Sequence, residues 1–106
     1  MTVFLNNFEV VIDGDISDSV TTIDLLDTGE YDVIIEDAGV KGSNPMYLTG
    51  INPDGAFEIM ACISSTIFGG QTRIGVQRAQ EGTTGLAFTS GTTLTGNVTA
   101  GILTAL

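Results

Sequence analysis

The sequence contains no histidine and no tryptophan, and it has a single cysteine, Cys62. Without histidine the chain cannot form a Ser-His-Asp triad or use an imidazole as a general base. One cysteine cannot build a zinc site of the Cys/His kind, nor a disulfide within the chain, so the composition indicates folding in a reducing compartment. We expect Cys62, in the middle of a predicted strand, to be a buried side chain rather than a nucleophile.

Basic residues are almost as rare as cysteine. Three of them, Lys41, Arg73 and Arg78, stand against thirteen acidic residues, and the net charge is −10. Ten of the acidic residues lie in the acidic segment, residues 9–37, which contains no base. Nucleic acids and anionic membranes bind proteins through Lys and Arg, so neither is an expected partner. The acidic segment instead favours solubility or a basic protein partner.

Long hydrophobic runs are absent too. No apolar stretch approaches the roughly 18 residues needed to cross a bilayer. Residues 1–10 lack both a basic start and a long apolar stretch, so we expect no signal peptide. With 106 residues, 42% of them apolar, the chain has the size of one domain and is too apolar for a disordered tail. We therefore expect one β domain over residues 1–106, with no cofactor.

Helix signals are scarce because fourteen glycines and many threonines interrupt any helical periodicity. Apolar alternation instead predicts strands at 7–13, 19–27, 30–37, 45–51, 56–65, 72–78 and 87–99. Turns with glycine are predicted at 27–30, 52–55 and 68–71, the last of which favours a hairpin, and a long loop at 36–45. In 56–65 the pattern predicts one apolar face, formed by Phe57, Ile59, Ala61 and Ile63. These features indicate an all-β fold, an antiparallel β-sandwich or small β-barrel.

Two groups of carboxylates are candidates for chemistry. Asp13, Asp15 and Asp18 bring together oxygens of the kind that Ca²⁺ prefers, but the spacing does not match an EF-hand. We interpret them as a solvated turn and expect no bound metal. Glu58 and Glu81 could be imagined as a glycosidase pair, but nothing in the sequence places them in one cleft. Acidic residues on strands usually face solvent, and we expect no enzyme.

The aromatic residues are expected mostly in the core, since they follow the apolar alternation of their strands. Residues 1–7 are less regular and could form an N-terminal arm, with Phe4, Leu5 and Phe8 contacting a neighbouring protein. The absence of tryptophan argues against a platform for stacking sugars.

The stretch QRAQEGTTGLAF (residues 77–88) can be interpreted as a small catalytic loop or as a turn between strands. A catalytic loop needs a base that this chain lacks. As a turn, the stretch places Arg78 and Glu81 close enough to pair or to cap backbone groups. Gly82 then supplies a backbone conformation that a β-carbon resists, and Phe88 enters the core.

This stretch resembles a module of tailed-bacteriophage virion proteins. There, a strand ending in Arg runs into a Gln-Glu-Gly-Thr-Thr turn, an Ala-Phe pair, a glycine turn, a Thr/Val-rich strand and a closing Thr-Ala-Gly-aliphatic stretch. The residue after the Arg is usually Gly in this pattern and is Ala79 here, and the loop 36–45 is longer. The matching positions are Arg78, Gln80, Glu81, Gly82, Thr83, Thr84, Ala87, Phe88, Gly91, TTLTGNV (92–98) and TAGIL (99–103).

The resemblance implies a non-enzymatic structural protein of the virion, assembled in the host cytoplasm. Such a protein docks on other virion proteins as a symmetric oligomer, with a trimer favoured. The pattern is most typical of tail or fibre-associated proteins, with the major capsid protein as partner if the chain is instead a capsid-decorating (cement) protein. A carbohydrate-binding module is a more remote alternative.

Overall fold

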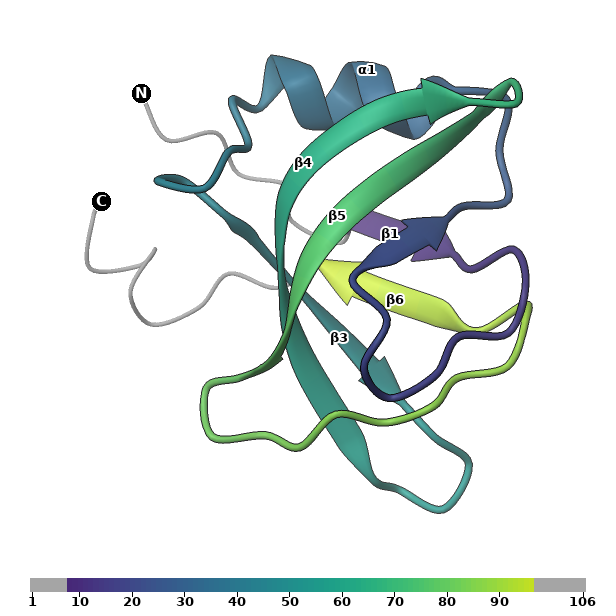
Figure 1. Cartoon of the computed structure of the whole chain (residues 1–106), viewed down its shortest axis with the longest axis vertical. Helices are drawn as coiled ribbons and strands as arrows, with labels where there is room; N and C mark the ends of the chain where they lie inside the picture. Colours follow the sequence, from purple (N-terminus) through teal and green to yellow (C-terminus); the bar gives the residue numbers. More distant parts are fainter. Residues whose placement is uncertain (1–7, 97–106) are drawn as a thin grey trace.

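The computed structural model describes residues 8–96 and confirms the all-β prediction. Its strands form one antiparallel sheet with the spatial order β1-β6-β3-β4-β5-β2, and one helix lies beside it (Figure 1). The described elements are, in chain order, β1 (Phe8–Val11), β2 (Thr22–Asp24), α1 (Glu30–Asp37), β3 (Met46–Ile51), β4 (Phe57–Phe68), β5 (Gln71–Gln80) and β6 (Thr93–Gly96).

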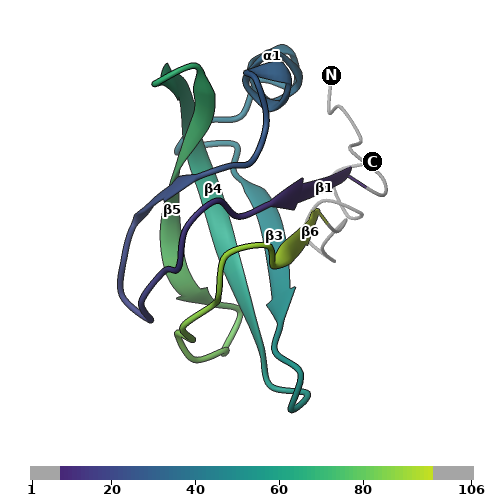
Figure 2. The same ribbon diagram turned by 90° about the vertical axis from the view of Figure 1, so that its right-hand side faces the viewer.

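The sheet curls into a half-barrel (Figure 2), so the residues that follow its two edge strands, β1 and β2, come together. An isolated antiparallel bridge joins Ile12 to Leu25. Next to it, the Asp13 N–H donates to the Asp24 carbonyl at 2.9 Å, and the Leu26 N–H donates to the Val11 carbonyl at 2.8 Å. These bonds occupy sheet edges that would otherwise present unpaired backbone groups. Of the two predicted architectures, the fold is therefore closer to a small barrel than to a sandwich.

The longest strands, β4 and β5, form the predicted hairpin around Gly69 and Gly70. Both glycines have positive φ, 60° and 80°, as the tight two-residue turn requires. Two register irregularities interrupt this pair, one between Ile59 and Ala61 and one between Cys62 and Ser64. Irregularities of this kind bend strands and increase their twist, which helps the sheet to curl.

The strand prediction for residues 30–37 is wrong, because this segment is helix α1. Its apolar residues fit both the two-residue period of a strand and the 3.6-residue period of a helix, because Tyr31 and Ile35 are four residues apart and share one face of a helix. Ile35 is buried and Tyr31 packs against the core. Glu30 and Asp32 in the first turn suit the positive end of the helix dipole. The predicted loop 36–45 correspondingly begins only after Asp37.

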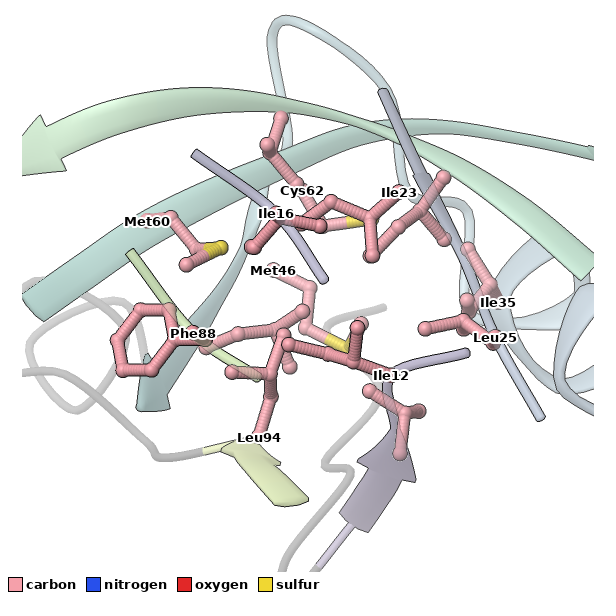
Figure 3. Packing of buried hydrophobic residues seen from close by; sticks show 14 residues of the cluster. Ile12, Ile16, Ile23, Leu25, Ile35, Met46, Met60, Cys62, Phe88 and Leu94 are labelled. Atoms are coloured by element: carbon pink, nitrogen blue, oxygen red, sulfur yellow. The ribbon is translucent and has the colours of Figure 1, made fainter. Parts of the chain in front are cut away.

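The core lies inside the curled sheet, beneath α1 (Figure 3). Phe88 is 1% exposed, as predicted, and Val10, Ile23, Ile74 and Leu94 are also buried. Together the buried apolar side chains form one continuous cluster, and they are Val10, Ile12, Ile16, Ile23, Leu25, Ile35, Met46, Leu48, Met60, Cys62, Ile74, Val76, Phe88 and Leu94.

The face assignment for β4 is wrong. The inward side carries Glu58, Met60 and Cys62, whereas Phe57, on the predicted apolar face, is 52% exposed. Phe68 is exposed as well, so the expectation that most aromatic residues are core does not hold for β4. Both sides of this strand carry apolar residues, and alternation alone therefore could not orient it.

Several predictions fall wholly or partly outside residues 8–96. The N-terminal arm (1–7), with Phe4 and Leu5, and the closing stretch TAGIL lie outside the described residues, as does Val98 of the predicted strand 87–99. Within that predicted strand, only Thr93–Gly96 is strand. No helix in the described part of the chain has both the length and the apolar character needed to cross a membrane.

Candidate functional site: the buried ion pair of Glu58 and Arg78

The guanidinium of Arg78, at the end of β5, forms a bidentate ion pair with Glu58 on β4. Nε donates to Glu58 Oε2 and Nη2 donates to Oε1, both at 2.8 Å. The two side chains are 7% and 0% exposed. Parallel bonds of this kind are stronger and more directional than single hydrogen bonds between neutral groups. The ion pair thus fixes the end of the β4–β5 hairpin opposite to its turn.

The remaining guanidinium N–H groups bind backbone carbonyls of two loops. Nη1 donates to the Ser17 and Val20 carbonyls, at 2.8 and 2.9 Å, in the β1–β2 loop (residues 12–21). Nη2 donates to the Leu86 carbonyl at 2.6 Å in the β5–β6 loop (residues 81–92). A guanidinium has five N–H groups, and all five are bonded here. Arg78 therefore has no donor left with which to bind a ligand.

Glu58 is equally occupied. Besides the two bonds from Arg78, its carboxylate accepts the N–H groups of Ala79 at 2.9 Å and Leu86 at 2.8 Å. Burial raises the pKa of Glu58, but the bonds from Arg78, Ala79 and Leu86 outweigh it, and the net pKa lies below its usual value. The carboxyl is thus an anion at neutral pH and is not suited to act as a general acid.

The backbone around Arg78 is unusual in its conformation. Ala79 and Glu81 have positive φ, 54° and 55°, the only described residues other than glycine to do so. Gly82 also has positive φ, 77°, as predicted. The irregularity between Ile59 and Ala61 accommodates one extra residue of β5 at this point. A positive φ is less favourable for Ala79 than for a glycine, because the β-carbon crowds the backbone in this conformation.

The β5–β6 loop is tied to the sheet by side chains of the same stretch. The Thr83 hydroxyl accepts the Ile59 N–H at 3.0 Å and donates to the Gln80 carbonyl at 2.6 Å. Phe88 exchanges backbone hydrogen bonds with Ile16, at 2.9 and 3.1 Å. A β-carbon on Gly85 would come within 2.4 Å of the Asp18 carbonyl oxygen, so only glycine allows the two loops to approach this closely.

The other predicted residues of the turn are placed as follows. Gln80 closes β5, and its side-chain amide donates to the Arg78 carbonyl at 3.0 Å. Thr84 is exposed. Gly91 has φ 90°, and its N–H donates to the Ile12 carbonyl at 2.8 Å. These contacts tie the C-terminal end of the loop to the end of β1.

Two sequence predictions about charged residues need correction. Arg78 pairs with Glu58 and not with Glu81, which is exposed. Glu58 was expected to face solvent and is instead fully buried. The expectation failed because an acid on a strand is buried only with a matched partner, and that partner lies twenty residues away in the sequence.

The three aspartates of the candidate cation site do not converge. Asp13 accepts a bond from the Gln71 side chain at 2.6 Å, and Asp15 accepts the Ser90 N–H at 2.8 Å. Within residues 8–96 no three acidic, cysteine or histidine side chains are grouped so that they could hold a metal ion. Asp13 and Asp15 therefore tie neighbouring segments of the chain together.

Phe8 was predicted as a possible contact with a neighbouring protein. It is partly buried in β1, and its ring meets the Tyr31 ring edge-on with centroids 5.8 Å apart. Phe8 thus helps to seat α1 against the sheet.

A second buried polar group, which the sequence did not suggest, holds α1 to the sheet. The side chain of Thr72 on β5 is fully buried, and its hydroxyl donates to Asp27 Oδ2 at 2.6 Å and accepts the Asp32 N–H at 3.0 Å. Asp27 also accepts the N–H groups of Thr72 at 2.8 Å and Tyr31 at 3.0 Å. Asp27 and Glu30 have the spacing of a capping box, but the N-cap is Gly29 and Glu30 is the first residue of α1, so this pattern indicates a nearby helix start and not the contact with Thr72.

Cys62 lies in the core, as expected. Its thiol donates to the Ser64 carbonyl at 3.5 Å, and burial raises its pKa to about 11. The thiolate that a nucleophile requires is therefore not populated at neutral pH.

All the hydrogen-bonding groups of the Arg78 guanidinium and both oxygens of the Glu58 carboxylate bind within the chain. The ion pair therefore holds two strands and two loops together. No protein-family model matches the chain, and comparison with curated proteins gives no significant match.

Proposed function

We propose that this chain is a non-enzymatic structural protein of a bacteriophage virion, which docks on other virion proteins as a symmetric oligomer. A place in the tail or at a fibre is favoured by the resemblance of residues 78–103 to tail-associated modules. The observation that carries the proposal is that the residues of this stretch hold the fold together and leave no group for catalysis. Arg78, Thr83 and Phe88 all bind or pack within the chain.

The acidic segment supplies the second argument. It includes β1, β2 and α1, and it exposes carboxylates such as Glu9, Glu36 and Asp37 without a base among them. Such a surface suits a basic or neutral region of another protein and disfavours contact with a second acidic segment. We therefore expect docking on the partner to weaken as salt concentration rises.

Cryo-electron microscopy of purified particles, combined with mass spectrometry of their proteins, tests the proposal. Density for this fold at the tail or fibre base supports it. Density on the shell supports the alternative, a cement protein that bridges neighbouring capsid subunits. If the chain is absent from mature particles, the proposal is wrong.

A further inference from the structure

Helix α1, at one end of the half-barrel, has an exposed side that combines apolar and acidic residues (Figure 2). Tyr31 and Ile35 lie on the other side of the helix and pack against the core. On the exposed side, Val33 is 60% and Ile34 is 38% exposed. Residues three, four and seven positions apart share one side of a helix. We call this side the α1 surface, and its residues are Glu30, Val33, Ile34, Asp37 and the flanking Glu36.

The end of β4 adds a further apolar side chain next to the α1 surface. Ile67 is 49% exposed, and a β-carbon on Gly29 would come within 3.0 Å of its Cδ1 atom. Ile67 therefore lies against the start of α1. Exposed apolar side chains that gather on one part of a protein indicate a contact with another molecule.

Two carboxylates of the α1 surface have no partner within residues 8–96. In the acidic segment, six of the ten carboxylates accept hydrogen bonds from the chain, and they are Asp13, Asp15, Asp24, Asp27, Glu30 and Asp32. The four that accept none from the described residues are Glu9, Asp18, Glu36 and Asp37. Glu36 and Asp37 are consecutive on α1, whereas Glu9 and Asp18 are isolated from each other in the sequence. The α1 surface is thus where two unpaired charges meet exposed apolar residues.

The position of Glu36 and Asp37 on the helix favours a cation from another molecule. They stand in the last turn, where the helix dipole is negative, and no basic residue accompanies them there. Lys41, the nearest base in the sequence, is exposed and belongs to neither of the ion pairs in residues 8–96. Both carboxylates add to the negative potential of the helix end. A lysine or arginine of a partner is therefore stabilised more here than beside an isolated acid.

The combination of charge and apolar area decides which partner fits. Nucleic acids and anionic membranes are repelled. A wholly apolar partner would remove water from the carboxylates without replacing its hydrogen bonds. A second copy has few cations to offer, because Arg78 is buried and Arg73 pairs with Asp24, which leaves only Lys41 of its three bases.

We propose that the α1 surface, together with Ile67, docks a segment of another protein in which lysine or arginine stands next to apolar side chains. This rests on the proposed function only for the expectation of a protein partner, and it names the surface used. The apolar side chains of the partner cover Val33 and Ile34, and its cations reach Glu36 and Asp37. Because α1 has eight residues and is about 12 Å long, the contact is weak for one copy and gains strength when many copies bind together.

An NMR titration of the full chain with synthetic peptides tests the proposal. The probe is a short peptide of lysine and leucine, and in two comparison peptides serine replaces leucine or glutamate replaces lysine. The lysine–leucine peptide should shift the backbone amides of residues 30–37 and of Ile67, and its affinity should fall as salt rises. The serine peptide should bind about fivefold more weakly, because it buries less apolar area. The glutamate peptide should not bind.

Matched double variants show whether the position of the charge matters. Glu36→Gln with Asp37→Asn should weaken binding of the lysine–leucine peptide by about fivefold or more. Glu9→Gln with Asp18→Asn makes the same chemical changes and removes the same charge elsewhere on the acidic segment. This control should weaken binding by less than about twofold.

A second pair of variants tests the apolar contact. Val33→Ser should weaken binding of the lysine–leucine peptide by about fivefold, and it should leave α1 intact because valine and serine have similar helix propensities. Ile51, on β3, is 62% exposed, so Ile51→Ser is the matched control and should change the affinity by less than about twofold. Unfolding temperatures verify that each variant is folded.

Three results would overturn the proposal. The first is that the lysine–leucine peptide does not bind at about 1 mM. The second is that both double variants weaken binding equally, because binding would then follow the net charge of the chain and not the α1 surface. The third is that the chain associates with itself through residues 30–37, which would put a second copy in place of the basic partner.

The two proposals fail in different ways. Particles that contain the chain, while the peptide does not bind to the α1 surface, would leave the virion role standing and remove this contact. Peptide binding that is lost in Glu36→Gln with Asp37→Asn, together with particles that lack the chain, would do the reverse.

Discussion

Glu58 and Arg78 lie on neighbouring strands and bind each other twice at 2.8 Å, with almost no exposure of either side chain. Their other bonds reach Ser17, Val20 and Leu86 in two loops. One ion pair therefore connects two strands and two loops. Desolvation of a buried pair is costly, so its value lies less in net stability than in selecting one arrangement of these segments.

Removal of one partner should be more damaging than removal of both. Glu58→Gln leaves the Arg78 charge buried without its counter-ion, and we expect it to lower the free energy of unfolding by about 3 to 5 kcal/mol. The double variant Glu58→Leu with Arg78→Met removes both charges and should recover only part of that loss, because the backbone groups of Ser17, Val20, Ala79 and Leu86 that the pair binds lose their partners. Urea denaturation followed by circular dichroism measures each value.

The exposed pair of Arg73 and Asp24 provides the control. Its closest contact is 2.6 Å, shorter than in the buried pair, but the side chains are 30% and 36% exposed. Asp24→Asn makes the same chemical change as Glu58→Gln and should cost less than about 1 kcal/mol. If Asp24→Asn and Glu58→Gln lowered the free energy of unfolding equally, burial would not be the reason for the cost of breaking the Glu58–Arg78 pair.

Stability should fall in acid because of Glu58 and Asp27. Burial raises the pKa of each carboxyl. Hydrogen bonds lower it by more, chiefly from Arg78 to Glu58 and from Thr72 to Asp27, so both net pKa values lie below the ordinary values. A depressed pKa means that the unfolded chain binds protons more readily. The stabilisation is complete above the ordinary values of 4.5 and 3.8, and it is lost as pH falls through the folded values.

Urea midpoints measured from neutral pH downward test this acid dependence. Asp27→Asn should flatten the curve, because it removes one of the two titrating groups. A wild-type curve that stays level through the acid range would contradict the assignment.

Ala79→Gly should leave the stability unchanged or raise it by up to about 1.5 kcal/mol. The positive φ of Ala79 costs an L-residue about 1 to 2 kcal/mol, whereas glycine loses about 0.5 to 1 kcal/mol through added freedom in the unfolded chain. Ala56 is exposed and has no positive φ, so Ala56→Gly should destabilise. Thermal unfolding measures the stability of both variants. If Ala79→Gly and Ala56→Gly destabilised the protein equally, the backbone of Ala79 would not be strained.

Thr72→Val should loosen α1 from the sheet. Valine keeps the shape but removes the hydroxyl that binds Asp27 and Asp32, and leaving these groups unpaired costs about 1 to 3 kcal/mol. Hydrogen exchange should accelerate in residues 30–37 more than in β4 and β5. Thr72→Ser keeps the hydroxyl and should preserve the protection of α1. Uniform acceleration across all elements would instead indicate global destabilisation.

Local chemistry made much of the architecture predictable from the sequence. The Gly69-Gly70 turn and the alternation in β1, β5 and β6 were recognised because their causes, positive φ and a single apolar face, act within a few residues. The segment 30–37 was misjudged because its apolar residues satisfy both periods, and contacts with Thr72 and the core select the helix. The orientation of β4 could not be predicted while Glu58 looked like a solvent-facing residue.

The sequence by itself determined an acidic β protein without the groups for imidazole or zinc chemistry, because composition and short-range turn geometry do not depend on the fold. Only the tertiary structure decided that Arg78 binds Glu58, that the edges of the sheet meet at Ile12 and Leu25, and that Ile51 and Phe57 lie exposed on neighbouring strands. Each of these depends on residues brought together by strand order, and strand order is fixed by non-local pairing that no local pattern specifies.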